Sequence, residues 1–172
     1  MQRLHGLLGD SDAVEQQGGR IALARDRVWV DAWQFEAGLV AARGSRGGSP
    51  SALADALALY RGQFLAEEEG DAWPVAMRER LRAKFIDAVA GHAGTLESSG
   101  HDDEAIAWYQ RGLGADPLVE RFYQGLMRCY HRAGRLPEAV SSYRRLKQAL
   151  SITLSLPPSE STERLYQRLR LG

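Results

Sequence analysis

The chain has 172 residues with 22 basic and 22 acidic side chains, so its formal net charge is zero, and 44% of its residues are hydrophobic. This balance argues against a uniformly basic nucleic-acid module, and the large apolar fraction argues against a disordered chain. No uncharged stretch is long enough to cross a bilayer, no signal-peptide core opens the chain, and the single cysteine cannot form an internal disulfide. We therefore expect a soluble, cytoplasmic protein with no membrane partner.

The zero net charge conceals an uneven distribution along the chain. Residues 1–49 are balanced, residues 50–115 carry a net charge of −5, and residues 116–172 carry +5. Opposite charges attract each other, so such an asymmetry has consequences for packing. The pattern predicts that the acidic middle and the basic end meet, either within one chain or between two copies in a homodimer.

The first third of the chain mixes short extended segments with helix. Residues 4–10 are typical of the end of a helix. A Gly-Gly pair at 18–19 separates two short runs, 14–17 and 20–23, which predicts a β-hairpin. Residues 28–31, Val-Trp-Val-Asp, favour a further strand, so we expect two or three short strands in all.

The rest of the chain has the pattern of helices interrupted by loops. Asp31 is a suitable N-cap for the first helix, and Pro74 suits the first turn of a long one. An extended stretch is expected after Leu150, followed by a final helix capped by Ser159. The expected segments before it are a helix at 32–43, a Gly/Ser loop at 44–51, a helix ending near residue 62, an acidic loop at 66–72, a helix at 74–99, and a helix starting at 118.

A pattern with a period of 34 residues occupies the second half of the chain. In each unit a glycine ends one helix, a small alanine lets the next helix cross closely, and an aromatic residue fills the groove. This spacing predicts tetratricopeptide-like helical hairpins, and we expect Ala56 and Tyr60 to mark an earlier, irregular unit. The repeated positions are Gly100, Ala105, Tyr109 and Pro117 in one unit and Gly134, Ala139 and Tyr143 in the next.

Residues that can carry chemistry have simpler structural interpretations here. No Gly-Lys pair is present, which excludes a Walker-type phosphate-binding loop. His92 aligns with Leu126 across the repeat, so we expect a packed core histidine, and we expect Cys129 to be a buried thiol. Asp102 and its acidic neighbours fit helix capping better than metal binding. We therefore expect no catalytic residue, no metal, no cofactor and no enzymatic activity.

Two groups of basic residues are candidates for contact with nucleic acid. Arg20, Arg25 and Arg27 lie on the expected strands, where they can meet phosphates. A helix followed by a short hairpin is the second half of a winged helix, but an ordinary docking segment with exposed arginines fits equally well. The second group is expected to form a solvated outer face of the repeats and consists of Arg128, Arg132, Arg135, Arg144, Arg145 and Lys147.

Several short motifs occur together in the helical part. They are Leu-Tyr-Arg-Gly-Gln-Phe-Leu at 59–65, Trp73 before the Arg-rich run at 78–82, the repeat residues between 100 and 143, and Leu-Pro-Pro-Ser at 156–159. As a set they resemble the bacterial transcriptional activator domain of SARP-type regulators, and also the C-terminal region of large LuxR/MalT-like regulators. The resemblance covers about residues 52–170 and implies a role in the control of transcription.

Residues 1–36 resemble the last part of the OmpR-type winged helix that precedes this domain in SARP-type activators. The resemblance implies a truncated DNA-binding unit at 1–36 and a tetratricopeptide-like activator domain at 37–172. In the intact regulator we expect contact with DNA and with a protein partner such as RNA polymerase or another domain of the regulator. The alternative is a stand-alone tetratricopeptide adaptor unrelated to DNA. The DNA-facing residues that the resemblance implies are Gln2, Arg3 and His5 on the truncated helix and Gln17 and Arg20 near the wing tip.

Overall fold

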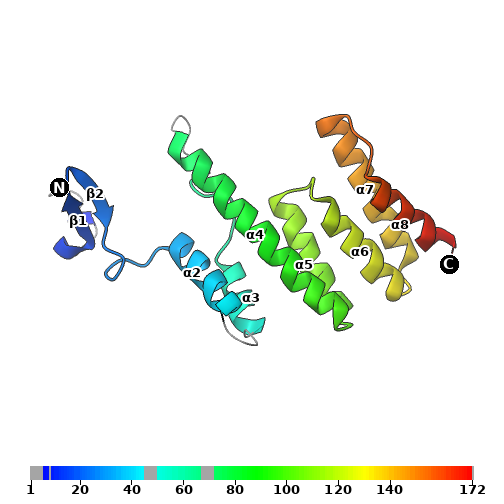
Figure 1. Ribbon diagram of the computed structural model, residues 1–172, viewed down its shortest axis with the longest axis horizontal. Coiled ribbons are helices and arrows are strands. Elements are labelled where there is room, and N and C mark those ends of the chain that lie inside the picture. The colour runs from blue at the N-terminus through cyan, green and yellow to red at the C-terminus, as the bar shows by residue number, and fades with distance from the viewer. Residues whose placement is uncertain (1–5, 8, 45–49, 67–71, 172) are drawn as a thin grey trace.

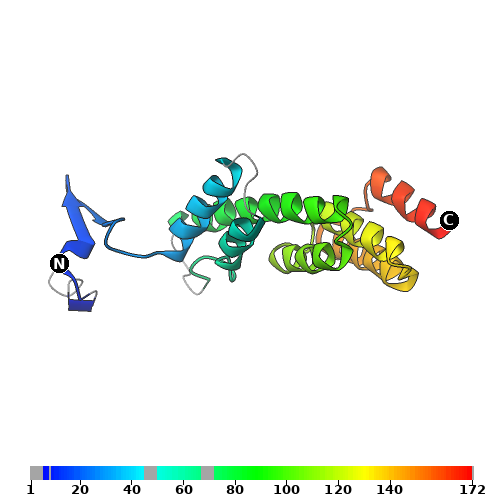
Figure 2. The same cartoon turned by 90° about the horizontal axis from the view of Figure 1, so that it is seen from below.

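The computed structural model describes residues 6–7, 9–44, 50–66 and 72–171. Within these ranges a two-stranded hairpin lies at one end of an elongated molecule, and helices follow one another along its long axis (Figures 1 and 2). The predicted mainly helical fold is confirmed. The elements are a 3₁₀ turn η1 (Ser11–Ala13), strands β1 (Val14–Gln17) and β2 (Arg20–Leu23), and helices α2 (Asp31–Gly44), α3 (Pro50–Ala58), α4 (Ala72–Ser98), α5 (Asp102–Ala115), α6 (Glu120–Arg132), α7 (Leu136–Leu154) and α8 (Glu160–Leu171).

The hairpin forms where the glycine pair predicts it. β1 and β2 are antiparallel, with Val14 opposite Leu23 and Gln17 opposite Arg20. Gly18 and Gly19 have φ angles of 59° and 77°. A two-residue hairpin turn with positive φ at both positions matches the twist of the strands, and glycine adopts it without strain.

The prediction of a third strand at residues 28–30 is wrong, because this segment is not extended in a sheet. The backbone N–H of Val28 donates to the carbonyl of Ala24 at 3.0 Å, and the carbonyl of Val30 accepts from the N–H of Trp33 at 3.1 Å. Its backbone is therefore engaged by the preceding turn and by the start of α2. Consequently Arg25 and Arg27 lie in the connection after β2 and not on a strand.

Helices α2 and α3 form a closely packed pair, as the small Ala56 predicts. Gly38 of α2 faces Ala56 of α3, and a Cβ atom at Gly38 would lie 2.6 Å from the Ala56 Cβ. Tyr60, just after α3, stacks on Phe85 of α4 with ring centroids 4.3 Å apart. The pair α2–α3 is thus an irregular unit that joins the repeats through α4.

The 34-residue period corresponds to two helical hairpins, α4–α5 and α6–α7. Gly100 and Gly134 end the first helix of each hairpin with φ of 79° and 71°, in the left-handed region that glycine favours. The residue after each glycine donates its backbone N–H to the carbonyl oxygen five residues earlier in the chain. His101 donates to Leu96 at 2.9 Å in one unit, and Arg135 donates to Tyr130 at 2.8 Å in the other. The same local rule therefore turns the chain at both places.

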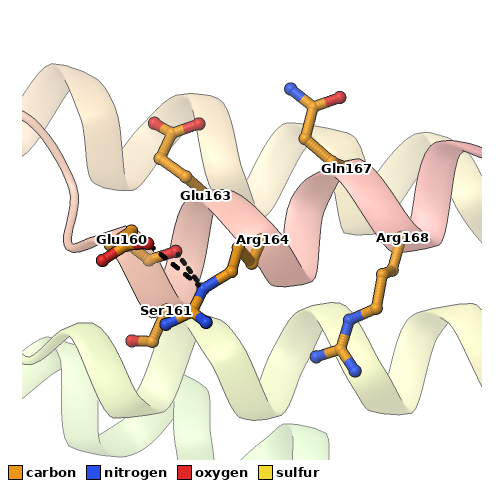
Figure 3. A pocket seen from close by; sticks show the side chains of 6 residues that line it. All are labelled: Glu160, Ser161, Glu163, Arg164, Gln167 and Arg168. Carbon is orange, nitrogen blue, oxygen red and sulfur yellow. Dashed lines mark hydrogen bonds and ion pairs between the residues drawn. The ribbon is translucent and has the colours of Figure 1, made fainter.

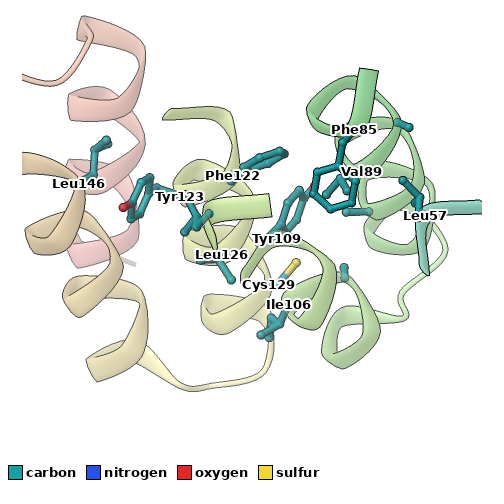
Figure 4. Close-up of a cluster of buried hydrophobic side chains, with 14 of the residues drawn as sticks. Leu57, Phe85, Val89, Ile106, Tyr109, Phe122, Tyr123, Leu126, Cys129 and Leu146 are labelled. Carbon is teal, nitrogen blue, oxygen red and sulfur yellow. The ribbon is translucent and has the colours of Figure 1, made fainter. Parts of the chain in front are cut away.

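The hydrophobic core runs without interruption from α2 to α7. Figure 4 shows Leu57 and Phe85 at one end of it, Tyr109 and Phe122 in the middle, and Leu146 at the other. A smaller cluster lies under α8, where Tyr143 stacks on Tyr166 with ring centroids 3.8 Å apart. Each helical pair therefore buries its apolar face against the next pair, as expected for stacked repeats.

Several helix ends differ from the sequence predictions. α3 begins at Pro50, within the predicted loop at 44–51, and it ends at Ala58 and not near residue 62. α7 continues to Leu154, beyond Leu150, because the N–H of Ser155 still bonds to the carbonyl of Ser151 at 3.2 Å. α6 begins at Glu120 and not at residue 118, since the Asp116 carboxylate holds the N–H of Leu118 at 2.9 Å in a local turn. Asp102 caps no helix; its side chain bonds to Arg132 of α6 instead.

Candidate interaction surfaces

The hairpin carries the candidate nucleic-acid contacts that the structure describes. Gln17 and Arg20 flank the Gly-Gly turn at its tip. Arg25 lies over the ring of Trp33, 4.8 Å from its centroid, and Arg27 is 3.8 Å from Asp26. Gln2, Arg3 and His5 lie outside the described residues.

One face of the hairpin carries two apolar side chains that the described part of the chain leaves exposed. Ile21 and Leu23 share this face with Gln16 and with Val14, which is buried, because the register places them on the same side of the sheet. Ile21 is 57% exposed and Leu23 39% exposed. Figures 1 and 2 both place the hairpin away from the helices, at the far end of the connection before α2. An isolated two-stranded hairpin is only marginally stable in water, so this face fits a partner surface.

A second candidate surface follows α4 and α6, the first helices of the two repeats, and the terminal helix α8. A hollow of about 340 Å³ lies between α4 and α6, with Gly94 and Glu97 on one side and Arg121, Gln124 and Arg128 on the other. The surface is polar, and its charges are paired across the helices, as in the ion pair of Arg121 with Asp87 at 2.7 Å.

Helix α8 extends this surface beyond α6. Gln124 donates to the Thr162 hydroxyl at 2.7 Å, and the Glu120 carboxylate accepts from the backbone N–H of Ser159 at 2.6 Å. An open hollow of about 730 Å³ lies along α8, and Figure 3 shows Ser161 and Arg168 on one side of the helix and Glu163 and Gln167 on the other. The hollow is open and is lined by residues of α8 alone, which suits contact with a protein surface better than enclosure of a substrate.

Glu97 is the centre of the largest ionic network in the described part of the chain. Its side chain is only 10% exposed; it accepts hydrogen bonds from the Tyr109 hydroxyl at 2.7 Å, from Nη2 of Arg128 at 2.9 Å and from Nη1 of Arg132 at 3.3 Å. Burial raises the pKa of Glu97, but the hydrogen bonds from Arg128, Tyr109 and Arg132 outweigh burial and hold this pKa below its ordinary value. The network ties α4, α5 and α6 together.

The acidic middle and the basic end of the chain meet across these helices. Arg128 and Arg132 of the basic end bind Glu97 of the acidic middle, and Arg121 pairs with Asp87 at 2.7 Å in the same sense. Arg128 and Arg132 keep part of the exposure that the sequence predicts, but both also bridge α6 to α4 or α5. Within that group of basic residues, those that remain exposed without an ion pair to a described carboxylate are Arg144, Arg145 and Lys147.

The remaining candidate chemical residues are structural. Cys129 is fully buried, and burial together with the nearby Glu97 charge raises the pKa of its thiol to about 12. A thiol with so high a pKa is protonated at neutral pH and is a poor nucleophile. The described residues contain no cluster of three or more metal-ligating side chains. In the same ranges, no helix combines the length and the apolar character that a membrane crossing requires.

His92 is buried, as the repeat alignment predicts, and it packs edge-on against Trp108 with ring centroids 5.1 Å apart. Burial lowers its pKa, which the Glu104 carboxylate only partly offsets. Below about pH 6.5 the unfolded chain therefore takes up a proton before the folded chain does, and stability falls as the pH decreases. We expect His92→Leu to reduce the loss of unfolding free energy between pH 7.5 and pH 5.5, measured by urea denaturation. An unchanged pH dependence would contradict a buried neutral His92.

Comparison with known protein families matches residues 30–170 to the bacterial transcriptional activator domain. This match covers most of the chain, from the start of α2 to the penultimate residue of α8. The chain belongs to this family. Bacterial transcriptional activator domains occur in transcriptional regulators, which are not enzymes.

A solved structure agrees with the helical fold of this activator domain. The chain is similar to Mycobacterium tuberculosis EmbR in complex with a low-affinity phosphopeptide, with a TM-score of 0.69 and 21% sequence identity. The alignment covers 99% of this chain and 46% of EmbR, so the chain spans about half the length of that protein. No curated protein matches the sequence.

The structure also identifies contacts that the sequence patterns do not predict. Glu97 aligns with His131 across the repeat, so the repeat provides no signal for its network. Gly125 faces the ring of Tyr109, and Gly112 faces the ring of Phe122. For Gly125 a signal exists, because Gly91 precedes it by one period, although only Gly125 is enclosed.

Proposed function

We propose that this activator domain binds a protein partner and positions a winged-helix DNA-binding unit, of which the β1–β2 hairpin is the wing. The observation that carries the proposal is the apolar side of the hairpin, where Ile21 and Leu23 are exposed beside the buried Val14. In a winged helix such a face packs on the preceding helices, while the polar tip approaches the DNA backbone. Gln17 and Arg20 lie at that tip.

We place the division between the two units just before α2. The sequence predicts it after residue 36, but α2 begins at Asp31 and the family match begins at residue 30. The helical unit then consists of α2–α8, whose surface along α4, α6 and α8 supports contact with a protein. Stacked helical hairpins characteristically present extended surfaces of this kind to a partner. That partner is RNA polymerase, another domain of the regulator or a second copy of the chain, in the cytoplasm.

DNA binding by this chain alone tests the proposal. Because only the wing contacts phosphates, we expect weak, non-specific binding with a strong salt dependence. Each neutralised phosphate contributes about −0.9 to the slope of log K against log salt concentration. Contacts from Arg20, Arg25 and Arg27 therefore give a slope of about −3. Fluorescence anisotropy of a labelled duplex at several salt concentrations measures both the affinity and its salt dependence. Tight, sequence-specific binding by the 172-residue chain would contradict the partial winged helix, and no binding at low salt would favour an adaptor unrelated to DNA.

A further inference from the structure

A separate pocket of about 340 Å³ lies on the repeat domain, away from the hairpin and from the α4–α6–α8 surface. It is bounded by the segment after α3, by α4 and by the C-terminal half of α5. Its lining combines two aromatic rings, two arginines and small residues: Tyr60, Arg61, Gly62, Phe85, Arg111, Gly114 and Ala115. The pocket therefore contains positive charge and no acidic side chain.

Arg111 is the central charge of this pocket. Its Nη2 donates to the carbonyls of Leu57 at 2.7 Å and Tyr60 at 3.2 Å, so it closes the C-terminal end of α3. The guanidinium also lies over the ring of Trp108, 4.9 Å from its centroid. These contacts hold Arg111 in place, but they are made to neutral groups.

Neither arginine of the pocket has an ionic partner in the described ranges of the chain. Arg111 and Arg61 form no ion pair there with a carboxylate, unlike Arg82 of α4 and Arg121, Arg128 and Arg132 of α6. A guanidinium has five N–H donors, and Arg111 uses only those of Nη2 in its hydrogen bonds. The Nε and Nη1 donors are therefore left for a ligand.

The physical chemistry of this arrangement favours an anion. Burial lowers the pKa of Arg111, because the guanidinium is partly removed from water and has no ion pair to a described carboxylate. A guanidinium can form two parallel hydrogen bonds to a carboxylate or phosphate group, which adds geometric specificity as well as energy. Gly62 and Gly114 leave open space where a side chain would stand, so an anion can approach the two arginines.

We propose that this pocket binds an oxyanion, a carboxylate or phosphate group, between Arg61 and Arg111. The group comes either from a small free anion or from an acidic side chain of a protein partner. The pocket is independent of the hairpin, so its existence does not rest on DNA binding by the chain.

Titrations of the 172-residue chain at constant ionic strength test this proposal. The probes are inorganic phosphate, succinate and the peptide acetyl-Gly-Glu-Gly-amide, and the readouts are the NMR shifts of the Gly62 and Gly114 amides and of Arg111 Nε–H. We expect saturable shifts with a Kd of about 1 mM for at least one probe. Saturation by phosphate or succinate identifies a free anion as sufficient, and saturation by the peptide alone identifies an acidic side chain. The absence of saturable shifts with all three probes would overturn the proposal.

Two variants connect binding to the pocket without removing the contacts of Arg111 to α3. Gly114→Glu places a carboxylate in the pocket and should weaken binding at least tenfold. Gly91→Glu, at an equally open helical glycine on α4, is the matched control and should leave binding unchanged. Arg61→Gln should weaken binding about threefold to tenfold, since one of two charges is lost. Binding by Gly114→Glu equal to that of the wild type would place the anion elsewhere and contradict the proposal.

Discussion

Gly125→Ala is expected to lower the free energy of unfolding by about 3 kcal/mol, near the upper end of the usual cost of overpacking. A Cβ atom at Gly125 of α6 would overlap the ring of Tyr109 on α5. That ring cannot move away easily, because it is buried, it contacts Phe122, and its hydroxyl is bound to Glu97. The helices α5 and α6 would have to separate, which also disturbs the core between them. Thermal unfolding of the variant should occur about 8 °C below that of the wild type.

Gly91→Ala provides a matched control one repeat earlier. Gly91 and Gly125 are 34 residues apart and both lie inside a helix, but no atom outside the local helix lies within 4 Å of a Cβ at Gly91. Alanine has the higher helix propensity, so this change should stabilise the chain by about 0.5 kcal/mol. Equal effects of the two substitutions would show that the close approach of Tyr109 to Gly125 is absent.

Glu97→Gln is expected to destabilise the chain by about 2 kcal/mol at pH 7. Removal of one member of a buried ion pair costs about 3–5 kcal/mol, and the cost is smaller here because Arg128 and Arg132 are partly exposed. The substitution keeps the shape of the side chain but directs an amide toward two guanidinium groups. Urea denaturation with the free energy extrapolated to water measures the loss.

The pH dependence of the same variant separates charge from packing. Glu97 has a lowered pKa in the folded chain, so the stability from its charge is present above about pH 4.5 and is lost as the pH falls through the folded value. Glu97→Gln should therefore lose less stability than the wild type between pH 5 and pH 3. Glu160→Gln, in an exposed pair with Arg164, is the control and should leave the unfolding midpoint unchanged. A wild-type acid response in Glu97→Gln would contradict the network.

Features governed by local backbone rules could be predicted from the sequence. Gly100 and Gly134 end helices in the left-handed conformation, and the Gly18-Gly19 pair forms a hairpin turn, because few other residues adopt positive φ without strain. The small Ala56, Ala105 and Ala139 are all buried, as their repeated spacing predicts. These signals lie within a few residues of the structure that they determine.

Features that depend on distant partners could not be predicted. Glu97 receives Arg128 and Arg132 from more than 30 residues away, and no local pattern distinguishes it from other acidic residues of a helix. Residues 28–30 have strand-forming composition, but the hydrogen bonds of Val28 and Val30 to the neighbouring turn and helix override it. The unbalanced positive charge of Arg111 is visible only when α3, α4 and α5 are brought together.

The most direct test of the account compares two triple variants in the DNA-binding measurement. Arg20, Arg25 and Arg27 are changed to Gln in one variant, and Arg144, Arg145 and Lys147 are changed to Gln in the other, so each loses three exposed positive charges. We expect the hairpin variant to bind a labelled duplex at least about tenfold more weakly at low salt with a flatter salt dependence, and the repeat variant to change by no more than about twofold. Equal losses in both variants, or a loss in the repeat variant alone, would contradict the assignment of the hairpin as the DNA-contacting wing.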